Sequence, residues 1–162
     1  MSGDWAVFFT AEVGASAALS GLVFVALSIN LHEIIGDPAL VGRAAQALLL
    51  LILPVGAGLA VLAPYDSQTD GAIALAIGTG IALAVNRLLL RAPRRPGRPR
   101  RELAFQVSTI ELALVPVLSG AILLASGSDL GGLGHGFLGF GDLASIGVGI
   151  LGGWVLLVEI LR

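Results

Sequence analysis

The chain contains five apolar runs, each long enough to cross a membrane as a helix. These runs occupy residues 5–31, 44–63, 71–90, 103–125 and 143–161. A hydrocarbon core about 30 Å thick takes about 20 apolar residues in helical conformation. Only 12% of the 162 residues are charged, whereas roughly a quarter are charged in a soluble domain. The sequence therefore predicts an all-α integral membrane bundle of five transmembrane helices, which forms a single transmembrane domain over residues 1–162.

The basic residues predict how the chain is threaded. All nine are arginines; Arg43 lies in the first link, most of the others lie in the third, and the N-terminus and the second and fourth links hold none. Because short cytoplasmic loops carry the excess of basic residues, five spans place the N-terminus outside and the C-terminus inside. We expect the third link to contact anionic lipid headgroups through Arg94, Arg95, Arg98, Arg100 and Arg101.

The acidic residues of the links fall on the opposite, outer side. Asp66, Asp70, Asp129 and Asp142 are predicted to form an outer acidic face, which would attract cations weakly at physiological salt. A four-span alternative, with the glycine-rich region 126–142 re-entrant or with two runs merged, stays open. With four spans, the arginines would no longer all lie on the cytoplasmic side of the membrane.

The first run combines an apolar helix with a polar stripe. At 100° per residue, Glu12, Ser16, Ser20 and Asn30 fall within about 80° of one another, and the small residues Gly14, Ala18, Gly21 and Ser28 lie roughly opposite. An ionised carboxylate at the depth of Glu12 is costly, so we expect it to be protonated, hydrated or paired with a cation. Two interpretations stay open: an ion or proton site, or a neutral acid that only fixes helix packing.

The fourth run carries a second polar stripe. It contains Ser108, Glu111 and Ser119 on one helical face, together with Ala104 and Val115. Pro116 removes a backbone hydrogen bond and is expected to bend this helix, either as a gate or as a static kink. Arg43 or Arg87 is expected to be within reach of Glu111, which predicts a structural ion pair as the alternative to a role in conduction. Arg87 could instead extend to the headgroups.

The motifs of several enzyme classes are absent or incomplete. The chain has no cysteine, which excludes disulfides and thiolate chemistry. Gly134, Gly136 and Gly139 match GxGxxG without a preceding strand, and the HExxH that begins at His32 is not completed. We therefore expect no enzymatic activity, no cofactor and no metal site. Nucleic-acid binding is also not expected, because the arginine run lacks interleaved aromatic residues.

Two segments resemble a known group of proteins. The segment GASAALSGLVFVALSINL, followed by a short link and RAAQALLLLILP, is similar to an uncharacterised family of small multipass bacterial inner-membrane proteins. The resemblance covers residues 14–54. It implies a location in the bacterial inner membrane and carries no activity, so it assigns no functional residue.

The leading functional hypothesis is a homo-oligomeric channel, or channel-like conductor, for ions or protons. Its pathway would use Glu12, Ser16, Ser20 and Asn30 of the first helix and Ser108, Glu111 and Ser119 of the fourth. The expected partners are the lipid bilayer, further copies of the chain and an inorganic ion. The alternative is a non-catalytic membrane subunit or scaffold, whose polar stripes bind partner helices. Binding of lipid or another hydrophobic ligand between the spans is not excluded.

Overall fold

The computed structural model describes residues 3–91, 100–128 and 130–160, and the side chains of residues 100–104 are not included in this description. The described chain folds into helices without strands. The helices are α1 (Gly3–Ile29), α2 (Leu31–Gly36), α3 (Pro38–Leu62), α4 (Ser67–Arg91), α5 (Arg100–Ala125) and α6 (Leu133–Ile160). All except α2 contain a segment long and apolar enough to span a membrane. This confirms the all-α prediction and suggests a multipass membrane protein.

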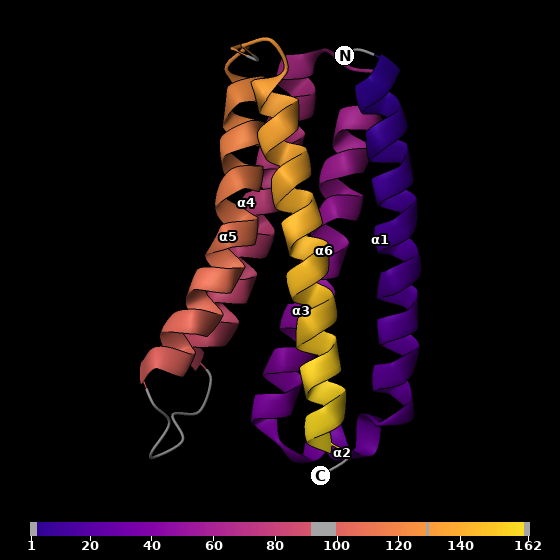
Figure 1. Ribbon diagram of the computed structural model, residues 1–162, viewed down its shortest axis with the longest axis vertical. Coiled ribbons are helices and arrows are strands. Elements are labelled where there is room, and N and C mark those ends of the chain that lie inside the picture. The colour runs from indigo at the N-terminus through magenta and orange to yellow at the C-terminus, as the bar shows by residue number, and fades with distance from the viewer. Residues whose placement is uncertain (1–2, 92–99, 129, 161–162) are drawn as a thin grey trace.

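The long helices form one bundle with α3 and α6 at its centre (Figure 1). Helix α3 packs against α1, α4 and α6, and α6 also packs against α5 and α1. As a result α3 and α6 lie between α1 on one side and the α4–α5 pair on the other. We call the end of the bundle where α1 and α6 begin the N-terminal end, and the end where α6 finishes the C-terminal end.

Short polar links start two of the helices. The backbone N–H of Ala39 donates to Asp37 Oδ1 at 2.8 Å, and Pro38 takes the first position of α3. Asp66 precedes α4 and accepts hydrogen bonds from the hydroxyl of Thr69 at 2.7 Å and from its backbone N–H at 3.2 Å. These bonds lower the pKa of the Asp66 carboxyl, because they favour its charged form. An aspartate in this position satisfies backbone donors that the first helical turn leaves free.

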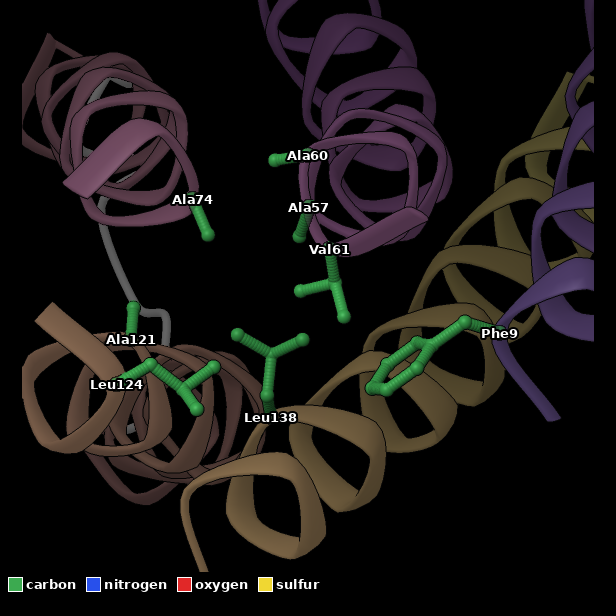
Figure 2. Packing of buried hydrophobic residues seen from close by; sticks show 8 residues of the cluster. All are labelled: Phe9, Ala57, Ala60, Val61, Ala74, Ala121, Leu124 and Leu138. Atoms are coloured by element: carbon green, nitrogen blue, oxygen red, sulfur yellow. The ribbon is translucent and has the colours of Figure 1, made fainter. Parts of the chain in front are cut away.

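The core near the N-terminal end is built from small side chains. Figure 2 shows the side chains of this cluster pointing into the space between the helices: Phe9, Ala57, Ala60, Val61, Ala74, Ala121, Leu124 and Leu138. The four alanines allow α3, α4 and α5 to approach closely, and the larger Phe9 and Leu138 fill the space beside them. Two further clusters continue the core toward the C-terminal end.

Helix α6 starts before the predicted last span. The glycine-rich stretch that was expected to belong to a link is helical from Leu133 onward. Glycines on both helices let α6 lie directly on α5. A Cβ on Gly141 of α6 would come within 2.5 Å of the backbone nitrogen of Val117, and one on Gly120 of α5 would come equally close to the carbonyl oxygen of Gly134. Glycine is a weak helix former, so this part of α6 is stabilised by packing against its neighbours.

Candidate ion-binding site

Two carboxyl groups lie inside the bundle, one on α1 and one on α6. Glu12 is 4% exposed and Asp142 is fully buried. The two groups are close enough for a charge on Glu12 to act on Asp142. Each lies nine residues from the start of its helix, about 13 Å from the N-terminal end by helical rise. Asp142 is therefore not part of an outer acidic face, as the sequence had suggested, because the helix extends beyond it.

Neither carboxyl group forms a hydrogen bond with the described protein around it. Within the described ranges, both oxygens of Glu12 and both oxygens of Asp142 are buried and have no hydrogen-bond partner. Desolvating a charged carboxylate without a partner is costly, and two adjacent negative charges add repulsion. Burial therefore favours a state in which the two groups are protonated, hydrated or paired with a cation.

Two buried serines fix the helices that carry these acids to α3. The hydroxyl of Ser145 donates to the carbonyl oxygen of Leu50 at 2.6 Å, and the hydroxyl of Ser16 donates to that of Leu51 at 2.5 Å. Pro54 has no N–H, so the carbonyl of Leu50 lacks its usual donor four residues further along α3. The serines supply hydrogen bonds at the position of this defect. Ser16 thus has a structural bond and does not face an open pathway.

Replacing Ser145 by Ala is expected to destabilise the folded bundle by about 1–2 kcal/mol, because it leaves a buried carbonyl without a donor. The measurement is unfolding of the purified protein in mixed micelles. Ser119→Ala is the matched control, since the hydroxyl of Ser119 donates only to Val115 in its own helix, and its effect should be close to zero. Equal effects of the two substitutions would contradict the role given to Ser145.

A second polar layer lies between the carboxyl pair and the N-terminal end. His135 is seven residues before Asp142 on the same face of α6, and its ring stacks on Trp5 with centroids 5.8 Å apart. Asp70 in the first turn of α4 is 9% exposed, and it lies within electrostatic range of His135. Ionisable groups are thus present at two successive levels on this side of the bundle.

Toward the C-terminal end the interior next to the pair is apolar. Leu51 is fully buried, and a Cβ on Gly149, one turn beyond Ser145, would come within 2.8 Å of its side chain. Leu27 and Leu156 belong to the buried cluster nearer that end. In this conformation the carboxyl pair is therefore separated from the C-terminal end by packed side chains.

Four of the predicted pathway residues donate hydrogen bonds to backbone carbonyls about one turn earlier in the chain. Ser20, Asn30, Ser108 and Ser119 donate to carbonyl oxygens three or four residues earlier. Asn30 follows the end of α1, and Ser108 is exposed. The described contacts do not join these residues to the carboxyl pair.

Glu111 lies apart from Glu12. It is half-buried on α5, and it accepts a hydrogen bond from Asn86 of α4 at 3.4 Å. The central helices α3 and α6 separate this side of the bundle from α1 (Figure 1). Of the two arginines expected as its partners, Arg43 forms an ion pair with Glu159 instead, and Arg87 is exposed.

The remaining charged residues of the prediction are distributed as follows. Asp66 is exposed and Asp70 is buried at the N-terminal end. Asp129, Arg94, Arg95 and Arg98 lie outside the described residues, as do the side chains of Arg100 and Arg101. The predicted outer acidic face is thus reduced to Asp66 among the residues that can be placed.

Comparisons with known proteins assign no role to the site, so its interpretation depends on the chemistry of its residues. No family model matches the chain, and no curated protein or solved structure matches it. Across the described ranges, no group of three or more histidine, aspartate or glutamate side chains is arranged to hold a metal ion. The carboxyl pair is the arrangement with the clearest chemical consequence.

Proposed function

We propose that the chain is a bacterial inner-membrane protein that binds and conducts protons or small cations at the Glu12–Asp142 pair. The observation that carries this proposal is the presence of two buried carboxyl groups, within electrostatic range of each other and without hydrogen-bond partners in the described protein. Ionisable groups inside a membrane are costly and commonly mark ion or proton pathways. Glu111, which the sequence suggested as part of the pathway, has no part in this proposal.

The polar layers support access from the N-terminal end. Asp70 and His135 lie between the carboxyl pair and that end, whereas Leu51 and its neighbours close the other side. The arrangement fits the closed state of a conductor, with its ion entering from the N-terminal end. Pro54 and Pro116 lie at nearly the same depth as the pair, eight and nine residues from the ends of α3 and α5, where helix bending could open the apolar side.

The distribution of arginines supports a location with the N-terminus outside and the C-terminus inside. Under this orientation the N-terminal end faces the periplasm. The layer of Asp70 and His135 then lies on the side where the activity of protons or cations is higher than in the cytoplasm.

A second candidate is the non-catalytic subunit or scaffold, and the outer face of α1 favours it. Gly14, Ala18 and Gly21 are exposed, and a Cβ on either glycine would meet no atom within 4 Å. Small residues on a membrane helix allow another helix to approach closely. A further copy of the chain or a different subunit fits this face, so it is compatible with a homo-oligomeric conductor as well.

Flux into liposomes distinguishes the two functions. Purified protein is reconstituted, and proton uptake and the uptake of sodium or potassium are followed under an imposed gradient and voltage. A conductor is expected to give flux above that of protein-free liposomes, in proportion to the amount of protein. Absence of flux for every ion across pH and voltage would leave the scaffold as the remaining candidate.

A further inference from the structure

An open cavity lies between α3, α5 and α6 in the half of the bundle nearer the C-terminal end. Its volume is about 670 Å³, within the range of roughly 300–1,000 Å³ that is usual for ligand pockets. Ala47, Leu50 and Ile110 form its buried floor. In Figure 1, α5 and α6 move apart toward this end of the bundle, which leaves room for the cavity between them.

The rim of the cavity is apolar and faces outward. Phe105 on α5 and Leu151 and Val155 on α6 line the rim and are 71%, 65% and 54% exposed. Side chains of this kind at membrane depth contact lipid, so the cavity opens sideways toward the hydrocarbon. An acyl chain can enter it without crossing a polar surface.

Three of the four polar side chains that line the cavity lie toward one end, and the fourth, Thr109, lies one turn further along α5. Arg43 lies five residues into α3 and pairs with Glu159, and Gln46 accepts a hydrogen bond from Gln106 at 3.4 Å. By helical rise, Arg43 is about 8 Å from the start of its helix, which is the depth of the headgroup region. The ion pair with Glu159 uses one of the five N–H donors of Arg43, and the others can serve a phosphate.

The charges at this end favour an anionic lipid over a second protein copy. Helix α4 ends at Arg91 and α5 begins at Arg100, and the sequence between them contains Arg94, Arg95 and Arg98. A second copy with the same orientation would bring its own arginine-rich link toward this one, at a cost in repulsion. Anionic headgroups instead neutralise these charges by electrostatic attraction.

We propose that this cavity binds one acyl chain of an anionic phospholipid, with the lipid phosphate hydrogen-bonded to Arg43 at the C-terminal end of the bundle. The site is separate from the Glu12–Asp142 pair and holds whether or not the protein conducts ions. Its ligand is a structural lipid of the leaflet that faces the arginine-rich link.

Gly152 offers a way to fill the cavity from α6. It lines the cavity, and an added Cβ would meet only the Cβ of Ala47 at an ordinary 3.7 Å. Gly152→Leu therefore occupies the space of the acyl chain without a backbone clash. Gly147→Leu is the matched control, since Gly147 is exposed on the same helix and a Cβ there meets nothing within 4 Å.

The experiment measures lipid retained by the purified protein in native mass spectrometry after exchange into detergent with added phosphatidylglycerol or phosphatidylcholine. The wild type and Gly147→Leu are expected to retain one phosphatidylglycerol per chain. Gly152→Leu is expected to lower the affinity for phosphatidylglycerol by about tenfold or more. Keeping only about two methylene groups of the acyl chain out of the cavity already has an effect of this size. Equal retention by the two leucine variants would overturn the proposal.

The double variant Arg43→Gln/Glu159→Gln tests the headgroup contact without leaving either partner as an unpaired charge. It is expected to remove most of the preference for phosphatidylglycerol over phosphatidylcholine. An unchanged preference would overturn the assignment of the phosphate to Arg43. A change in oligomeric state in Gly152→Leu, with lipid retention unchanged, would identify a second copy as the occupant and would also overturn the proposal.

Discussion

Replacing Glu12 by Gln is expected to reduce ion or proton flux into liposomes by at least about tenfold. The substitution keeps the size of the side chain and removes its ability to exchange a proton or balance a cation. An interaction of this type with a charged group contributes about 1.5–3 kcal/mol, and a barrier raised by about 1.4 kcal/mol already slows a rate tenfold. Asp142→Asn is expected to have an effect of the same size.

Two control variants show whether the loss of flux is specific to the Glu12–Asp142 pair. Glu33→Gln changes an exposed residue of α2 and should leave flux at the wild-type level. Glu111→Gln should also retain most of the flux, because Glu111 accepts a hydrogen bond from Asn86 of α4 and no described contact joins it to the pair. The variants are first compared with the wild type by thermal melting, so that lost flux is not confused with unfolding. Wild-type flux in a folded Glu12→Gln variant would contradict the assignment of the site.

Replacing Gly120 by Ala is expected to destabilise the bundle by about 1–3 kcal/mol or more, which is the usual cost of forcing an extra group into a packed core. The added Cβ would come within 2.5 Å of the carbonyl oxygen of Gly134 and of the backbone nitrogen of Leu138. Neither atom belongs to a flexible side chain, so α6 must move away from α5. Unfolding in mixed micelles measures the change.

Gly80→Ala provides the matched comparison in another long helix. A Cβ at Gly80 meets nothing within 4 Å, and alanine is the better helix former by about 1 kcal/mol. This substitution should be neutral or slightly stabilising. If Gly120→Ala were as well tolerated as Gly80→Ala, the close approach of α5 and α6 would be wrong.

The helical architecture could be predicted from the sequence because long apolar runs have few alternatives in a membrane. Backbone groups in hydrocarbon must be bonded internally, so such runs form helices. The burial of Glu12 inside the bundle was also predictable, since it lies in a long apolar run. Its neighbours were not, because the polar stripe of one helix does not reveal which other helix it meets.

Asp142 was misplaced because the glycine-rich stretch before it was interpreted as a link. Glycine usually weakens a helix, yet here it allows close contact between α6 and its neighbours. One signal was present in the sequence: His135, Asp142, Ser145 and Gly149 recur at spacings of seven, three and four residues, which places them on one helical face. The bond between Ser145 and Leu50 depends on the α3 register and could not be derived from that pattern.

The most direct test of the central claim is a flux measurement on the double variant Glu12→Gln/Asp142→Asn beside both single variants. If the two carboxyls form one site, removing the second after the first has little further effect, and the double variant should stay at about a tenfold loss. Independent residues would instead give losses that multiply to about a hundredfold. A multiplied loss, or wild-type flux in the double variant, would contradict a single conducting site between α1 and α6.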